Sequence, residues 1–138
     1  MRQETTLSHA DAMTILTTIR ERADQNGHGL AAAVVDSHGE LIAFLRTDGC
    51  RLPSIQIAMN KAYTAAREQV ESAALGKRAM SPERGFPMTN FGELRYVTWG
   101  GGVPVVAEGS VVGAVGVSGL SSEEDIEYAK IAIQALLG

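Results

Sequence analysis

The sequence predicts an α+β domain with a central antiparallel sheet of about five strands flanked by helices. Two hairpin patterns carry this prediction: paired apolar runs within residues 30–46, and a glycine-punctuated, valine-rich stretch at residues 100–119. Neither pattern has a helix between its two strands, so each pair must run antiparallel. The 138 residues have the size of one domain and contain no internal repeat, so we expect a single domain over residues 1–138.

The chain is expected to begin with a helix and a hairpin. Ser8 can cap the helix and Gly27 can end it, with apolar residues at helical spacing between them. The apolar runs at residues 30–35 and 41–45 are separated by turn residues and predict two strands. Asp36 is expected to support this turn by accepting hydrogen bonds from nearby backbone amides.

A second helix and an irregular stretch follow. Pro53 keeps the residue before it out of a helix, and Ser54 can cap the helix that comes next. Alanines along this helix form a stripe that allows close packing. Residues 72–96 contain several glycines and prolines, so we expect an ordered loop with only a short helical turn over residues 72–75.

The last third predicts three strands and a helix. Residues 96–99 are expected to form the third strand, before the glycine triplet and the valine-rich hairpin, which turns at residues 108–110. Ser121 or Ser122 can cap the final helix, whose first turn is acidic and suits the helix dipole.

Composition excludes several classes of function. The net charge of −4 gives no general attraction to nucleic acid or anionic membranes. No apolar run is long enough to span a bilayer, and the amino-terminal residues lack a secretory pattern, so we expect a cytoplasmic protein. The single Cys50 cannot form an internal disulfide. Signatures of serine hydrolases, phosphate-binding loops and zinc enzymes are absent from the sequence.

Four ordered blocks, at residues 34–50, 54–66, 100–105 and 111–132, resemble the GlcG/HbpS family, which includes the carboxy-terminal domain of PduO-type proteins. The resemblance implies a sheet flanked by helices, similar in outline to profilin-like and roadblock-like domains. It also implies assembly into homo-oligomers, dimers or larger. Some members bind haem and others accompany cobalamin or glycolate metabolism, so haem is the cofactor that the resemblance suggests.

The candidate ligand-binding residues each have a structural alternative. Lys61, with Thr64 on the same side of the second helix, either reaches solvent or meets a ligand carboxylate. Arg46 can bind a carboxylate or haem propionate, or pair with Asp48. Asp125 either helps to cap the last helix or organises Lys61 or a substrate. The glycines Gly100, Gly101, Gly102 and Gly119 are predicted either to help bind an anion or to serve turns and packing. Ser118 and Gly119, at the strand end before the last helix, form an anion site or belong to the capping of that helix.

A haem site would also need an iron ligand and an apolar wall. His28 and His9 are the preferred candidate ligands, although neither belongs to a spaced metal motif. Because no CxxCH sequence is present, haem binding would be noncovalent. Phe91 and Tyr96 belong to an aromatic-rich stretch that either lines a flat pocket, with Glu93 or Arg95 at its rim, or folds onto the domain or a neighbouring subunit.

Two main hypotheses follow from the sequence. In the first, an oligomeric protein binds haem or another tetrapyrrole, or a different small molecule with carboxylate groups. In the second, an enzyme isomerises, hydrates or cleaves a small organic acid, with Lys61, Asp125 or Glu93 moving a proton. A module whose aromatic-rich stretch serves only subunit assembly is the third interpretation.

Overall fold

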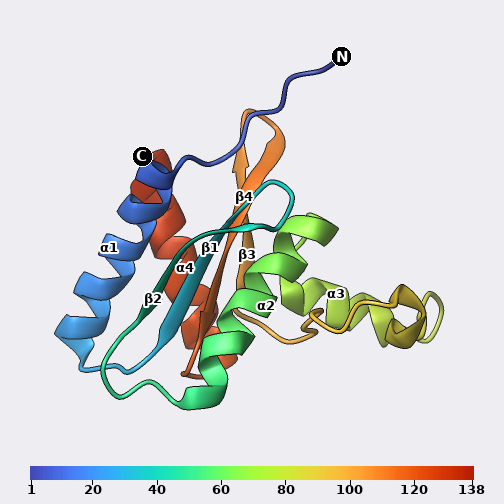
Figure 1. The fold of residues 1–138 in the computed structure, drawn as a ribbon. Helices are drawn as coiled ribbons and strands as arrows, with labels where there is room; N and C mark the ends of the chain where they lie inside the picture. Colours follow the sequence, from blue (N-terminus) through green and yellow to red (C-terminus); the bar gives the residue numbers. More distant parts are fainter.

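The computed structural model describes residues 1–138 and contains one sheet with helices on both faces (Figure 1). In chain order the elements are α1 (His9–Asn26), β1 (Ala31–Asp36), β2 (Leu41–Arg46), α2 (Leu52–Glu68), α3 (Ser72–Ala79), the 3₁₀ turn η1 (Met88–Phe91), β3 (Gly102–Ala107), β4 (Ser110–Ser118) and α4 (Ser122–Leu137).

The sheet has four antiparallel strands in the order β2-β1-β4-β3, so both predicted hairpins and the antiparallel pairing are confirmed. The prediction of about five strands is wrong, because residues 96–99 form no strand. Instead of bonding to a neighbouring strand, the backbone amide of Val97 donates to the hydroxyl of Thr64 on α2, at 2.9 Å. This segment therefore runs across α2 beside the sheet.

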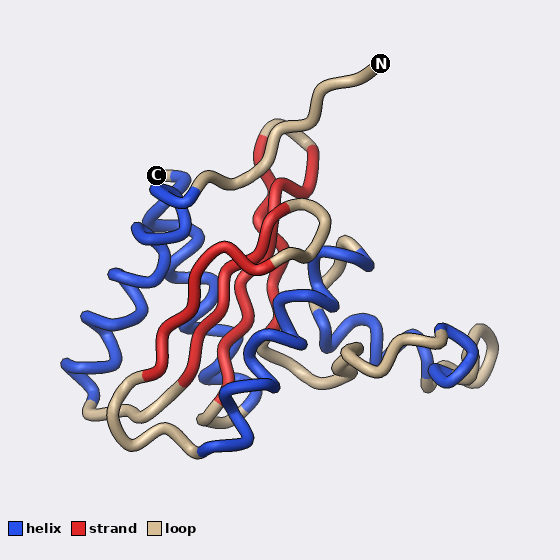
Figure 2. Tube along the Cα trace, viewed as in Figure 1, coloured by secondary structure: helices blue, strands red, loops and turns tan.

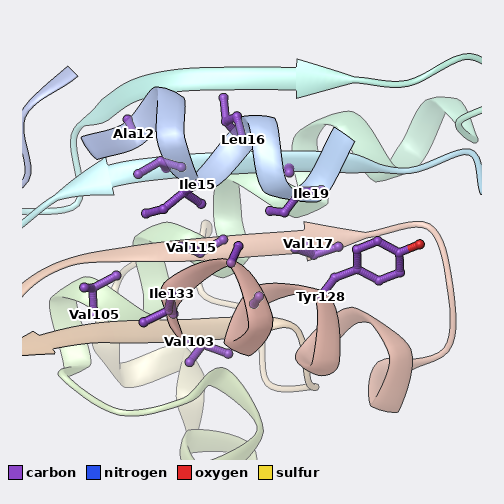
Figure 3. Packing of buried hydrophobic residues seen from close by; sticks show 14 of the residues in the cluster. Ala12, Ile15, Leu16, Ile19, Val103, Val105, Val115, Val117, Tyr128 and Ile133 are labelled. Carbon is purple, nitrogen blue, oxygen red and sulfur yellow. The ribbon is translucent and has the colours of Figure 1, made fainter. Parts of the chain in front are cut away.

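Helices cover the two faces of the sheet unequally. On one face, α1 and α4 pack against the sheet and against each other around a core that includes Ile15, Ile19, Val115 and Val117 (Figure 3). On the other face, the alanines of α2 pack directly on β1 and β4. A Cβ at Gly116 would lie only 2.5 Å from the backbone nitrogen of Ala62, so small residues set this close approach.

The ends of the helices follow the predicted chemistry except at α2. Ser8 caps α1 and Ser121 caps α4, each in a reciprocal capping box. The prediction that Ser54 caps α2 is wrong, since the helix begins at Leu52 with Arg51 in the capping position. Pro53 fits the first helical turn because its fixed φ is already helical and no amide is needed there.

The region between α2 and β3 is more helical than predicted. The helix α3 extends to Ala79 instead of ending at residue 75. Gly76 is a packing position here, because a Cβ on it would overlap the carbonyl group of Thr98. Residues 80–96, which we call the projecting segment, extend away from the sheet beyond α2 and α3 and then return to α2 (Figure 2). None of the helices combines the length and apolar character needed to cross a membrane.

Candidate functional site

Lys61 is buried at the point where α2 crosses the end of β4. Its side chain is 1% exposed, and its Nζ donates to the carbonyl of Val117 at 2.9 Å and to Oδ2 of Asp125 at 3.1 Å. Asp125, from the first turn of α4, is also buried. One side chain thus joins α2, β4 and α4, and the solvent-reaching interpretation of Lys61 is wrong.

The first turn of α4 leaves Asp125 free to face inward. Ser121 and Glu124 form the capping box, so the helix end does not depend on Asp125. The second carboxylate oxygen of Asp125 accepts a hydrogen bond from the amide of Leu120 at 3.2 Å. Both oxygens are therefore bound, one by the turn that precedes α4 and one by Lys61.

Two members of the glycine triplet make room for Lys61. A Cβ at Gly101 would lie 2.6 Å from the Lys61 Nζ, and its φ of +130° is in any case unfavourable for a side chain. A Cβ at Gly102 would overlap the Lys61 carbonyl oxygen, and the Gly102 amide donates to the hydroxyl of Ser72 at 2.9 Å. Gly100 packs on α4, where a Cβ would meet Ile126 at 2.6 Å. Whether these amides also bind an anion stays a prediction.

Burial shifts both ionisable groups of the pair toward their uncharged forms. Desolvation lowers the pKa of Lys61, and the charge of Asp125 opposes this shift in part. Desolvation likewise raises the pKa of Asp125, opposed by the charge of Lys61. The two groups are brought closer in acidity than an ordinary lysine and aspartate, which favours proton transfer between them.

The pair lines a pocket of about 180 Å³ at this end of the sheet. Ser54 from the start of α2 and Ser118 from the end of β4 contribute hydroxyl groups to its wall, and Gly119 follows on the same turn. Arg51 and Trp99 also line it and are exposed to solvent. The pocket is therefore small, polar on its buried side, and bordered by a cation and an indole ring.

A second, larger hollow of about 710 Å³ lies elsewhere, between the amino-terminal tail and the tip of the β3–β4 hairpin. His38 lines this hollow, and its Nε2 lies 2.7 Å from a carboxylate oxygen of Glu4 in the tail. None of the residues predicted for the site lines this hollow, so we place the candidate site at the Lys61 pocket.

The predicted aromatic and acidic residues of the projecting segment lie away from this pocket. Glu93 accepts a hydrogen bond from the hydroxyl of Tyr63 at 2.6 Å, and Tyr96 donates to Glu68 at 2.7 Å. Phe91 packs its edge against Tyr96. Hydrogen bonds from Arg95 and Tyr63 lower the pKa of Glu93 to about 2. These contacts attach the projecting segment to α2.

Two further predicted residues, Thr64 and Arg46, do not line the pocket. Thr64 is buried, and its hydroxyl donates to the carbonyl of Asn60 at 2.7 Å while accepting from Val97. Arg46 is exposed at the end of β2, in the same row of the sheet as Ser118, with Ala31 between them. Arg46 therefore lies at the pocket end of the sheet but does not line the pocket.

The two candidate iron ligands lie at opposite ends of α1. His9 is its first residue and is exposed, whereas His28 follows its last turn; the helix has 18 residues and is about 27 Å long. His28 Nδ1 lies 2.9 Å from the hydroxyl of Tyr128. Its neighbour Gly29 packs near the pocket, since a Cβ at Gly119 would lie 3.0 Å from the Gly29 carbonyl oxygen. No group of three or more metal-ligating side chains occurs.

Sequence reasoning missed Arg51, Ser54 and Trp99 as pocket residues. The sequence pattern predicts a helix cap at Ser54 and places Trp99 in a strand or an aromatic-rich stretch. The signal that could have found Arg51 is Pro53, because a proline in the first turn places the residue two positions earlier at the open end of the helix.

Comparisons with known proteins agree with this fold. The family model described as "Haem degrading protein HbpS-like" matches residues 7–134. Protein GlcG of Escherichia coli strain K12 is 36% identical over 125 residues, which cover 86% of this chain and 85% of GlcG. The crystal structure of Klebsiella pneumoniae protein ORFY superposes with a TM-score of 0.92 at 26% identity, covering 100% of this chain and 95% of ORFY. A crystal structure of a PduOC–haem complex superposes with a TM-score of 0.86 at 29% identity, covering 95% of each chain.

Proposed function

The chain belongs to the HbpS-like family, and from that premise we propose that it binds haem or a related tetrapyrrole noncovalently. The observation that carries the proposal is the likeness in fold to PduOC, whose crystal structure is that of a haem complex. The likeness extends over nearly all of both chains, so the elements that form the pocket end of the sheet have counterparts in PduOC.

The surface around the pocket suits a planar, acidic ligand. Leu52 is 72% exposed and Trp99 is 50% exposed, which leaves apolar area available for the face of a ring. Arg51 lines the same pocket as Trp99, directly before Leu52 in the chain, and its guanidinium can bind a propionate through paired hydrogen bonds. Arg46 at the end of β2 provides a second cation at the same end of the sheet.

His28 fits the role of iron ligand better than His9. Its Nδ1 is in hydrogen-bond contact with the Tyr128 hydroxyl, which would fix the ring, and its Nε2 lies 4.0 Å from a carboxylate oxygen of Glu124, too far for a hydrogen bond that a metal would have to displace. When bound, haem would supply a redox-active iron at this position. His28 would hold the iron, and Arg51 would orient the ring through its carboxylates. His9 lies at the far end of α1 and would not take part.

One chain covers such a ligand only in part. The pocket of about 180 Å³ is smaller than the roughly 300–1,000 Å³ typical of sites that enclose a larger ligand. Leu94 is 99% exposed and Met80 is 84% exposed on the projecting segment, an unusual display of apolar side chains. We therefore include in the proposal a homo-oligomer, in which a second copy covers this segment and completes the ligand site.

Titration with haemin tests this function. We expect a saturable shift of the Soret band, a changed Soret position for His28→Ala, and about tenfold weaker binding for Arg51→Ala through loss of the charged hydrogen bonds. His9→Ala is the matched control and should behave like the wild type. A titration that never saturates would refute specific haem binding. Equal effects of the two histidine substitutions would remove His28 as the ligand.

A second function is favoured by one specific observation, the buried Lys61–Asp125 pair in the wall of a small pocket. Such a pair can take a proton from, or return it to, a small organic acid. Pyruvate in D₂O is a suitable probe, and we expect its methyl protons to exchange faster with the protein, by NMR. Exchange that continues unchanged in Lys61→Met would exclude this function.

A further inference from the structure

Lys61 differs from the other lysines of the chain in its surroundings. The sequence has three lysines, at positions 61, 77 and 130. Lys77 is exposed on α3, and Lys130 is 56% exposed in a surface ion pair with Glu71. Only Lys61 is buried and lines a pocket. The chain therefore contains its own controls for the reactivity of a lysine amine.

The Lys61 nitrogen has one position left for a ligand. An ammonium group has three hydrogens, and the chain provides two acceptors, the Val117 carbonyl and Asp125. Burial also lowers the pKa of Lys61, and each unit of lowering raises the uncharged fraction of an amine about tenfold near neutral pH. A buried lysine of this kind is the usual nucleophile toward carbonyl compounds.

Two serine hydroxyl groups in the wall of the same pocket are available to a polar ligand. Ser54 and Ser118 line the pocket and are each 5% exposed. The one buried side-chain oxygen without a partner is that of Ser37, so the Ser54 and Ser118 hydroxyls are not sealed in the core and can bind a ligand in the pocket. Arg51 on the rim offers a cation for a carboxylate. At about 30 Å³ per water molecule, the pocket has room for roughly six waters, or a ligand with a similar number of heavy atoms.

We propose that Lys61 binds a small oxo acid covalently, as an imine, in this pocket. The carbonyl carbon would meet the Lys61 nitrogen, the hydroxyls of Ser54 and Ser118 would bind the oxygen atoms, and Arg51 would bind the carboxylate. The inference uses the pocket of the second candidate function and does not depend on haem binding.

The chemistry balances with the groups present. The uncharged Lys61 nitrogen forms a bond to the carbonyl carbon, and the carboxyl group of Asp125 gives its proton to the carbonyl oxygen. Asp125 then takes one proton from the nitrogen and passes it to the new hydroxyl group, which leaves as water when the carbon–oxygen bond breaks. The products are a protonated imine, the Asp125 carboxylate beside it and one water molecule, with no oxidation or reduction.

Reductive trapping tests the inference on the intact wild-type protein. Pyruvate and sodium borohydride are added near neutral pH, and the digested protein is mapped by mass spectrometry. We expect Lys61 to gain the mass of pyruvic acid less one oxygen atom severalfold more often than Lys77 or Lys130, because it lines the pocket and burial lowers the pKa of its amine. Lys61→Arg, which keeps the charge, should lose this adduct.

The outcomes separate the proposals made for this pocket. An adduct spread evenly over the three lysines, or absent from Lys61 at saturating pyruvate, would overturn imine formation. If methyl exchange still depended on Lys61 in that case, the noncovalent proton transfer would stand without the imine. Because the decisive readout compares lysines within one wild-type chain, a variant that fails to fold would not affect it.

Discussion

The Lys61–Asp125 ion pair holds three elements of the fold together at one buried point. Removing two charges from water is costly, and the cost is offset here by the short contact between them and by the bonds from Val117 and Leu120. The same burial that makes the pair costly also shifts its pKa values toward each other. The stability of this junction and the proposed chemistry thus depend on the same two side chains.

Breaking this pair should destabilise the protein far more than breaking a surface pair. For Asp125→Ala we expect a loss of about 3–5 kcal/mol in the free energy of unfolding, because Lys61 is left buried without a counter-charge. Urea denaturation measures it, and adding Lys61→Met should recover part of the loss. Lys130→Met, which breaks the exposed pair with Glu71, is the control, at under about 1 kcal/mol. Equal losses for the two pairs would contradict the structural role of Asp125.

The sequence predicted both members of the pair as candidate site residues but could not bring them together. Lys61 borders the alanine stripe of its helix, a position from which a lysine can reach either solvent or the core. Its partner lies 64 residues further along the chain, so their contact depends on how α2 and α4 cross the end of β4. Helical periodicity places a residue on a face of its helix but carries no information about distant partners.

At the scale of elements, the projecting segment is attached to α2 by polar contacts between tyrosines and carboxylates. Tyr63 donates to Glu93, and Arg95 lies over the Tyr63 ring at 3.8 Å. The segment carries little buried apolar area of its own, and none of the residues of η1 is buried. Its position relative to the sheet should therefore respond to the ionisation of Glu93.

We predict that acid weakens this attachment. The pKa of Glu93 falls from 4.5 to about 2 in the folded protein, chiefly through hydrogen bonds from Arg95 and Tyr63. The ionised form thus stabilises the fold above pH 4.5, and this contribution is lost as the pH falls from 4.5 toward 2. The gap in melting temperature between the wild type and Glu93→Gln should narrow over that interval. A difference in melting temperature between the wild type and Glu93→Gln that stays constant over this pH interval would contradict the prediction. So would an equal narrowing of the difference between the wild type and Glu123→Gln, a substitution at an exposed glutamate.

Hairpins were the elements best predicted from sequence, because turn residues and alternating apolar runs act locally. Asp36 does accept bonds from the amides of His38 and Glu40, as expected for its turn. The prediction of a third strand was wrong because this segment is determined by a contact with a distant part of the chain. The residues around Val97 have strand-like composition, yet a hydroxyl on α2 binds the Val97 amide that a strand partner would need. Whether the residues around Val97 form a strand therefore depends on how α2 packs.

At the scale of the whole molecule, apolar side chains are exposed on one side of the pocket end and along the projecting segment. In a single chain the side chains of Leu94 and Met80 are almost fully exposed to solvent, and Trp99 is half exposed. Isolated exposed apolar residues are ordinary, but several on one protruding segment indicate a contact surface. A second copy of the chain is the partner that our proposal assigns to it.

The oligomer should depend on this segment. We expect Leu94→Ser to shift the protein toward smaller species in sedimentation velocity, because it removes an apolar side chain from the contact. Its melting temperature at low protein concentration should change little, because the Leu94 side chain is 99% exposed and its loss leaves the core of the single chain intact. Met13→Ser, at an exposed position on α1, is the control and should leave the assembly intact. A Leu94→Ser protein that sediments like the wild type would contradict the assigned surface.

A crystal structure of the haemin-saturated protein would show whether the end of the sheet beside Lys61 receives the ligand. We predict the ring against Trp99 and Leu52, with a propionate on Arg51 and the iron facing His28. Haem bound instead in the hollow between the amino-terminal tail and the β3–β4 hairpin, with the Lys61 pocket left unchanged, would contradict the account.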